Sequence, residues 1–301
     1  MDLTKNLEKN IIFKVEEDGK TLEDFLLEQD ISSRLFRRVY KSKNIFVNGI
    51  LKNKNEILNI DDIVSIIIED EIDNTLPQNI PLDIIYEDMD ILALNKPPFI
   101  VVHPTKSHQE NTLSNGIAYY FKENNIKRKI RLVNRLDMNT SGILLVAKSS
   151  FAHQQMALQF ENNEVEKRYI AVVDGIVEKD KGIIDLPIGR EEEKSIRKIV
   201  TSNGKEAITK YKVIERYNNT TLLDIELVTG RSHQIRVHLN HIGHPIIGDT
   251  LYFEPSEHIN RQALHAYYLK IKQPRTYEEI ELKAKLPKDI EKITYNFRDS
   301  P

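Results

Sequence analysis

The stretch Arg135-Leu136-Asp137-Met138-Asn139-Thr140-Ser141-Gly142 places an acid two residues after an arginine, in a polar turn. The apolar run at residues 143–147 follows directly and predicts a buried strand that holds this turn in place. Two roles are open to Asp137. Its carboxylate can close the turn or cap a helix, which is the commonest use of aspartate in such segments. Alternatively, it is a nucleophile whose negative charge is held by a nearby cation, and the arginines around it favour this role.

The composition limits the possible classes of protein. The 301 residues are enough for two domains, and no apolar run is long enough to cross a membrane as a helix. The first 14 residues are polar and mixed in charge, so we expect no secretory signal, no membrane partner and a cytoplasmic location. The chain has no cysteine, which excludes disulfides, thiolate nucleophiles and cysteine-ligated metals. The net charge of −3 makes any binding to a polyanion depend on local charge.

Residues 19–69 predict a small α+β unit. Thr21 followed by Asp24 resembles a capping box that begins a first helix, and Ser33 is expected to cap a second one. Asn48-Gly49 lies between two short apolar runs, which predicts a hairpin with a type I′ turn. The unit therefore combines two helices with a hairpin.

The second of these helices is strongly basic. Its cations recur at i, i+3, i+4 and i+7 and so share one helical face, which carries Arg34, Arg37, Arg38 and Lys41. Residues 31–55 contain seven basic residues, including Lys52, and no acidic one. Because cations without compensating anions repel each other, we expect this surface to bind an anionic partner. The alternative is a basic face that is merely solvated.

This unit resembles the RNA-binding domain first described in ribosomal protein S-four. The resemblance rests on Ser33-Arg34, on the run at 46–49 and on the closing run at 62–64. Asp61 stands where that family usually has glycine. The resemblance implies that residues 19–69 bind RNA.

Residues 69–81 are acidic and then polar with two prolines, which makes them the best candidate for a linker. We place an RNA-binding domain at 1–76 and a catalytic domain at 77–301. After the linker, apolar patterns predict strands at 84–86, 91–94, 143–147, 169–173, around 211–213 and at 221–228. Helical patterns are fewer and lie at 112–121, 152–160 and 232–241. We predict an α+β fold, with a mixed, mainly antiparallel sheet, flanking helices and a central cleft.

A second arginine-rich segment reads TGRSHQIRVHL at residues 229–239. Ser232 is expected to cap a helix here, which puts Arg231 and Arg236 near the helix N-terminus. The macrodipole disfavours cations at that end, so an anion is expected beside them, either Asp137 or an RNA phosphate. We expect His233 to bind backbone or phosphate. The spacing of the four histidines at 233–244 fits no familiar ligand pattern, and we expect no metal.

Two further segments contain candidate contacts. Lys167 and Tyr169 begin an apolar strand, where the tyrosine either packs in the core or stacks on an extruded base. Residues 94–104 predict a strand, a turn stiffened by prolines and a second strand. Lys96 and His103 lie in this segment, and they are either structural or face a polyanion.

Together, residues 84–287 resemble the RluA-type family of RNA pseudouridine synthases. The most specific motifs are Arg-Leu-Asp-x-x-Thr-Ser-Gly at 135–142 and Thr-Gly-Arg-x-His-Gln-Ile-Arg-x-His at 229–238. The resemblance implies that Asp137 is the catalytic aspartate, that Tyr169 contacts the target uracil and that Arg236 pairs with the aspartate. Arg135 would help to order the extruded nucleotide and its phosphate.

Two positions depart from the family pattern. Asn134 replaces the usual histidine before Arg-Leu-Asp, and Phe99 occupies a position where glycine is common. Neither position contains the acid. We therefore expect them to affect RNA contacts or local backbone shape more than activity.

Pseudouridine formation breaks an N-glycosidic bond and rejoins the uracil through carbon. Nothing is oxidised and no group is imported, so no cofactor is expected. Asp137 would act either as a nucleophile or as a base. The expected partner is RNA, with large-subunit ribosomal RNA first and transfer RNA as the alternative, and we expect a monomer. Two rival functions are an RNA-binding protein without activity and a carboxylate hydrolase of glycosidic bonds, although the latter usually needs two acids.

Overall fold

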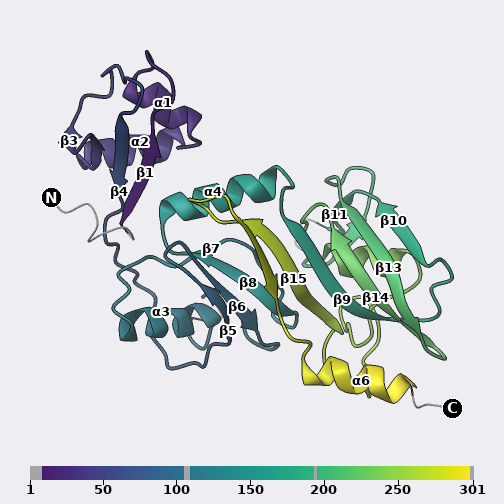
Figure 1. The fold of residues 1–301 in the computed structure, drawn as a ribbon. Helices are drawn as coiled ribbons and strands as arrows, with labels where there is room; N and C mark the ends of the chain where they lie inside the picture. The colour runs from purple at the N-terminus through teal and green to yellow at the C-terminus, as the bar shows by residue number, and fades with distance from the viewer. Residues whose placement is uncertain (1–8, 105–108, 193–194, 299–301) are drawn as a thin grey trace.

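The computed structural model describes residues 9–104, 109–192 and 195–298 (Figure 1). Part of the N-terminal segment for which we expect no secretory signal, residues 1–8, lies outside these ranges. The first unit is a four-stranded sheet in the order β1-β4-β2-β3, packed against two helices. Its elements are β1 (Asn10–Lys14), α1 (Leu22–Glu28), α2 (Ser33–Lys41), β2 (Ile45–Val47), β3 (Ile50–Leu51) and β4 (Ile63–Ile67).

The local signals in this unit are largely confirmed. The Thr21 hydroxyl accepts a hydrogen bond from the Asp24 backbone N–H and so caps the N-terminus of α1. Asn48 and Gly49 both have positive φ, as a type I′ turn requires. The prediction that Ser33 caps α2 is wrong by one residue. Ser32 has extended ψ, and its hydroxyl accepts from the backbone N–H three residues ahead, so Ser33 is already helical.

The second unit is built on a ten-stranded sheet in which β10-β13-β14-β9-β15-β8-β6-β5 are neighbours. In addition, β16 pairs with β15 and β7 with β8. All pairings in this sheet are antiparallel except that of β15 with β8. The predicted α+β class and mainly antiparallel mixed sheet are confirmed. The elements are β5 (Ile84–Glu87), β6 (Ile91–Lys96), α3 (Leu113–Glu123), β7 (Arg131–Leu132), β8 (Ser141–Ala147), α4 (Ser150–Glu161), β9 (Glu166–Asp174), β10 (Lys181–Asp185), β11 (Ile188–Arg190), β12 (Lys198–Val200), β13 (Ile208–Arg216), β14 (Thr220–Leu227), α5 (Gln234–His241), β15 (Leu264–Lys272), β16 (Glu279–Lys283) and α6 (Lys288–Arg298).

One predicted strand is absent. Residues 97–104 form turns and irregular chain where we expected a second strand after the prolines. Phe99 adopts a positive φ of 65°, which turns the backbone and explains why glycine suits this position. The carbonyls of Val101 and Val102 then accept from the first residues of α3, so they are committed to the helix N-terminus.

Strand β8 is at the centre of the molecule, and every one of its residues is buried. It begins beside β15, with Gly142 opposite Ala266. A Cβ at Gly142 would lie 2.2 Å from the Ala266 carbonyl oxygen, so only glycine allows this approach. Next to it, the hydroxyl of Ser141 and Nδ1 of His265 are 2.9 Å apart. The Ser-Gly pair that ends the polar turn therefore fixes the turn against β15.

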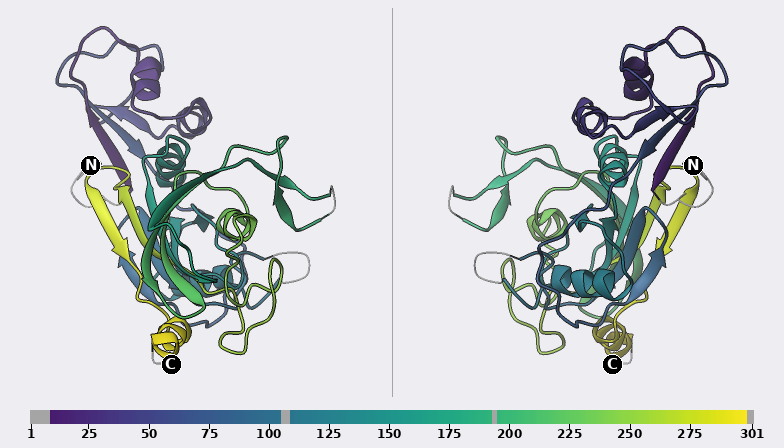
Figure 2. Two further views of the ribbon diagram at one scale, coloured as in Figure 1. Left: turned by 90° about the vertical axis from the view of Figure 1, so that its right-hand side faces the viewer. Right: turned by 90° about the vertical axis from the view of Figure 1, so that its left-hand side faces the viewer.

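The N-terminal unit packs on α4 at one end of the molecule, and α6 lies at the other end (Figures 1 and 2). Phe151 of α4 is buried within the hydrophobic core of the N-terminal unit. The Gln154 side chain accepts a hydrogen bond from the Ser32 backbone N–H at 3.0 Å. The proposed linker is also held, because both carboxylate oxygens of Glu71 accept from Nη2 of Arg131, at 2.6 and 2.8 Å. These contacts define one orientation of the basic helix relative to the large sheet.

Candidate active site

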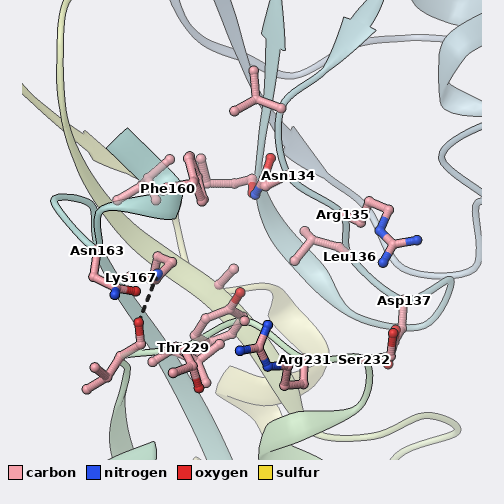
Figure 3. A pocket seen from close by; sticks show the side chains of 18 of the residues that line it. Asn134, Arg135, Leu136, Asp137, Phe160, Asn163, Lys167, Thr229, Arg231 and Ser232 are labelled. Carbon is pink, nitrogen blue, oxygen red and sulfur yellow. Dashed lines mark hydrogen bonds between the residues drawn. The ribbon is translucent and has the colours of Figure 1, made fainter. Parts of the chain in front are cut away.

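A cleft of ≈ 860 Å³ crosses the large sheet (Figure 3). Its walls come from the segment before β8, the end of α4, the start of β9 and the loop between β14 and α5. These segments are far apart in the sequence. The pairing of β9 with both β14 and β15 brings them together. The cleft is therefore a product of the sheet order, and it lies where the predicted motifs converge.

Asp137 lies in the wall of this cleft, at the turn that precedes β8. Its backbone carbonyl accepts from the Thr140 N–H at 3.0 Å, which closes the turn. Its carboxylate Oδ2 accepts from Nη1 of Arg236 at 2.9 Å, and the side chain remains 34% exposed. The acid is thus paired with a guanidinium but still open to the cleft, which is the arrangement a reacting carboxylate needs.

Arg236 is the bridge between two acids. It is 7% exposed, and Asp249 accepts two hydrogen bonds from its Nε and Nη2, each at 2.7 Å. Its guanidinium carbon also lies 5.1 Å from the centre of the Tyr252 ring. Burial lowers the pKa of Arg236, but the hydrogen bonds and charges of Asp249 and Asp137 outweigh burial and raise it overall. The arginine therefore stays charged, and Asp249 sets its direction towards Asp137.

The start of α5 differs from the prediction. Ser232 does not cap the helix. The N-cap position is His233, which has a left-handed backbone with φ 59° and makes no side-chain cap. This conformation turns the imidazole into the site, where Nδ1 lies 2.9 Å from the Tyr252 hydroxyl and Nε2 lies 3.9 Å from the Asp137 carboxylate. Burial lowers the pKa of His233, and the charge of Asp137 opposes this.

Tyr169 is an aromatic residue that lines the same cleft as Asp137. It lies in β9, is partly exposed and lines the cleft, while the rest of its ring packs against the core of the sheet. Burial and the nearby charge of Asp137 both raise the pKa of its phenol, so the group stays neutral. The structure thus combines the two alternatives for Tyr169, since the ring is both anchored in the core and available to a ligand.

The family model for RNA pseudouridylate synthase matches residues 90–241, which contain Asp137, Tyr169 and Arg236. The chain is 39% identical over 292 residues to the "Uncharacterized RNA pseudouridine synthase YlyB" of Bacillus subtilis, covering 94% of this chain and 96% of that protein. This chain belongs to the RNA pseudouridine synthase family. A further relative, "Ribosomal large subunit pseudouridine synthase D" of Buchnera aphidicola, is 34% identical over 91% of this chain and 93% of its own length.

A solved structure supports the same membership for the synthase. "Human RNA Pseudouridylate Synthase Domain Containing 1" superimposes with a TM-score of 0.58 at 26% identity, covering 73% of this chain and 96% of the human chain. The two sheets therefore share strand arrangement as well as sequence. The expectation of an RNA pseudouridine synthase is confirmed at the level of the family.

The other residues predicted to contact RNA either line the cleft or lie outside it. Arg135 and Arg231 are exposed and line the cleft, and Arg231 also donates to the Glu206 carbonyl at 2.8 Å. Lys167 lines the cleft as well but is mostly buried. His103 is exposed outside this cleft, in a separate hollow beside the linker. On the N-terminal unit, Lys52 is paired with Glu56 at 2.6 Å.

Lys96 does not face a polyanion, and that alternative is wrong. Its side chain is 0% exposed, and Nζ donates to the carbonyls of Pro97 and Met138 at 2.8 Å each. Arg261, also almost fully buried, donates to the Asn139 carbonyl at 3.1 Å. Two buried cations thus hold the backbone that follows Asp137. Burial and the charge of Arg261 together lower the pKa of Lys96 to about 7, against the opposing charge of Asp137.

Asp249, Tyr252 and Arg261 were not among the residues predicted for the site. Nothing local in the sequence assigns Asp249 to an arginine thirteen residues earlier. Within the described part of the chain, no group of three or more histidine, aspartate or glutamate side chains could hold a metal ion. One of the histidines tested for this, His238, is buried between Thr209 and the Leu186 carbonyl. No helix among the described residues is long and apolar enough to span a membrane.

Proposed function

We propose that the synthase converts uridine to pseudouridine in large-subunit ribosomal RNA and that Asp137 is its catalytic residue. The observation that supports this most directly is the Asp137–Arg236 pair at 2.9 Å, open to a cleft whose facing wall is Tyr169. The name of the Buchnera relative favours ribosomal RNA as the substrate class, and this substrate places the synthase in the cytoplasm. Transfer RNA is the alternative substrate.

The proposed reaction needs only groups that the cleft supplies. The N1–C1′ bond of uridine breaks, a C5–C1′ bond forms, and the proton of C5 is exchanged for one on N1. The base must first leave its stack, which costs a few kcal/mol and favours loops and open strands. Confinement between Asp137 and Tyr169 then keeps the freed uracil beside the sugar, ahead of escape or attack by water. The carboxylate serves either as nucleophile or as base in this scheme.

Arg236 has a defined role in this proposal. Because the pair with Asp249 orients its guanidinium, Arg236 presents one N–H to Asp137 and favours the ionised acid. Arg135 at the rim would hold the phosphate of the extruded nucleotide. Arg231 and His233 line the same wall and would contact neighbouring RNA.

We further propose that residues 1–76 form an RNA-binding domain and that residues 77–301 form the catalytic domain. The exposed cations of α2 are suited to phosphate contacts, since Arg34, Arg37 and Lys41 all face solvent. Arg38 is exposed but occupied differently, because it donates to the Ser150 hydroxyl and lies 3.8 Å from Glu71. We therefore assign affinity to the first three cations and domain contact to Arg38.

The catalytic assignment is tested with Asp137→Asn. This variant retains the size of the side chain but loses its charge, so turnover is expected to disappear while RNA binding largely survives. Turnover is measured by tritium release from RNA labelled at C5 of uridine. The matched control is Asp180→Asn, because that side chain is 85% exposed and pairs with Arg216. Near-normal turnover by Asp137→Asn would show that the assignment is wrong.

The substrate is identified by carbodiimide-adduct primer extension on ribosomal and transfer RNA from cells with and without the synthase. A stop that disappears from large-subunit RNA in the deletion strain supports the proposal. A stop lost only from transfer RNA selects the alternative. Binding without loss of any stop would favour an RNA-binding protein without activity.

The RNA-binding surface is tested by changing Arg34, Arg37 and Lys41 together to glutamine. Each lost phosphate contact should reduce the slope of log affinity against log salt by roughly 0.7 to 0.9. The control is a triple change of exposed lysines near β10, Lys179, Lys181 and Lys212. An unchanged slope for the first triple variant would remove α2 from the RNA surface.

A further inference from the structure

The cleft is longer than the space beside Asp137. One end is formed by Asp137, Tyr169 and His233, and a small inner cavity opens there. The other end lies beyond Lys167, at Phe160 and Asn163 near the end of α4 (Figure 3). A cleft of ≈ 860 Å³ is in the upper range of pockets that enclose whole drug-sized ligands, whereas a uracil base alone is much smaller. The far end therefore has room for a second group.

Lys167 lies beside Phe160 and Asn163, at the end of the cleft away from Asp137 (Figure 3). Its side chain is 8% exposed, and within the described residues its ammonium has a single hydrogen-bond acceptor, the Val228 carbonyl at 3.4 Å. An ammonium has three N–H donors, and a buried charge is costly unless these are used. Burial accordingly lowers the pKa of Lys167. Because the Lys167 ammonium lines the cleft and has N–H donors to spare, we expect an anionic group of a ligand to bind beside it.

Phe160 provides an aromatic surface next to this ammonium. The Lys167 Nζ lies 5.5 Å from the centre of the Phe160 ring, which is only partly buried. The surrounding wall combines apolar side chains, among them Leu132 and Val133, with the polar side chains of Glu161 and Asn163. Flat aromatic rings on apolar walls are the surfaces on which proteins stack single-stranded bases.

Asn134 contributes shape to this end, and both its amide nitrogen and its amide oxygen already make a hydrogen bond within the protein. Its amide nitrogen donates to the Ile143 carbonyl at 3.0 Å, and its amide oxygen accepts from the Leu145 N–H at 2.8 Å. Both groups are committed to β8. Base identity at this end would therefore be selected weakly, by stacking on the ring.

The spacing along β9 separates the two ends. Lys167 and Tyr169 are two residues apart on one face of the strand, which places them roughly 7 Å from each other. Stacked bases of one strand are about 3.4 Å apart, so a base at Phe160 would be unstacked from one at Tyr169. The linking phosphate would then lie over Lys167.

We propose that the cleft has a second nucleobase site, in which Phe160 stacks on the base adjacent to the target uridine and Lys167 binds the phosphate that joins the two nucleotides. This site rests on the proposed function, because it assumes that the target uracil lies between Asp137 and Tyr169. It extends that function by making the synthase recognise a dinucleotide step.

The test is a double-mutant cycle on an RNA hairpin that carries the mapped target uridine. The base on its 5′ side, on its 3′ side, or three positions away is replaced by an abasic ribose. Wild type is compared with Phe160→Leu, which keeps an apolar side chain, and with Phe160→Tyr, which keeps the ring. Tyr295→Ala removes a 65% exposed aromatic on α6 and serves as the control. Melting temperatures show that each variant is folded.

For wild type, removing one of the two adjacent bases should raise KM by roughly 5- to 150-fold, the range expected from stacking on one aromatic ring. Phe160→Leu should show the same loss on the intact hairpin and no further loss on the abasic one, and Phe160→Tyr should restore wild-type behaviour. Lys167→Met should weaken binding and reduce its salt slope. Equal KM for intact and abasic hairpins, with turnover intact, would overturn the second site and leave the proposed function standing. If wild type fails to convert even the intact hairpin, both are overturned.

Discussion

Asp249 gives the sharpest prediction, because its carboxylate pairs with the arginine that also holds Asp137. Asp249→Asn leaves the shape of the side chain almost unchanged but removes the charge opposite Arg236. The carboxylate is 1% exposed, and it accepts both hydrogen bonds at 2.7 Å. The variant therefore leaves a buried guanidinium with one acid, Asp137, instead of two.

The magnitude follows from this geometry. Breaking a buried ion pair by removing one partner costs about 3–5 kcal/mol, because the remaining charge is uncompensated. For a chain of this size that loss lowers Tm by roughly 5–8 °C. The catalytic effect is separate, since a guanidinium that is no longer oriented from behind will shift against Asp137. A misplacement of about 1 Å is enough to lower kcat by about 100-fold.

A matched control separates stability from chemistry. Asp90 is fully buried and accepts a similar bidentate pair from Arg275, at 2.7 and 3.0 Å, remote from the cleft. Asp90→Asn should lower Tm by a comparable amount and leave kcat near wild type. The assays are thermal unfolding and tritium release well below both melting temperatures. If Asp249→Asn keeps kcat within about threefold of wild type, or if Asp90→Asn loses as much activity, Asp249 does not position Arg236 for catalysis.

Three other predictions concern stability and are checked by urea unfolding. Gly142→Ala should lower the free energy of unfolding by about 3 kcal/mol or more, because the added methyl group meets the backbone of β15. Gly243→Ala, at φ 84° with open space around it, should lower it by about 1 kcal/mol. Equal losses would refute the close-contact argument. Burial lowers the pKa of His265 from 6.5 to about 4. The free energy of unfolding should therefore be highest above pH 6.5 and fall by about 3 kcal/mol as the pH drops to 4, because protonation favours the unfolded chain. His265→Gln should flatten this pH dependence. Ser32→Ala should cost about 1 kcal/mol and Ser33→Ala much less, a difference that reverses if Ser33 is the true cap.

The sequence by itself was sufficient for the local elements and for the motif residues. Capping side chains, the Asn48-Gly49 turn and the apolar runs act within a few residues, so their patterns predicted the hairpin, most helices and many strands near the observed places. The strand expected after the prolines is absent, and β15, β16 and α6 were not predicted. The Arg-Leu-Asp and Thr-Gly-Arg motifs likewise marked Asp137 and Arg236, which the structure joins at 2.9 Å. The prediction at α5 was wrong, because Ser232 has the chemistry of an N-cap but the helix begins after His233. His233 has a left-handed backbone, and its imidazole contacts the Tyr252 hydroxyl.

Only the tertiary structure decided which charges are exposed and which support the site. Lys96 and Lys167 are both lysines in basic or polar segments, yet one is enclosed under the Asp137 turn and the other lines the cleft. The pairing of β6 with β8 places Lys96 opposite Gly142, next to the Asp137 turn, whereas the pairing of β9 with β14 and β15 places Lys167 in the wall of the cleft. The contact between Asp249 and Arg236 arises in the same way, since folding brings both side chains into one buried, low-dielectric place.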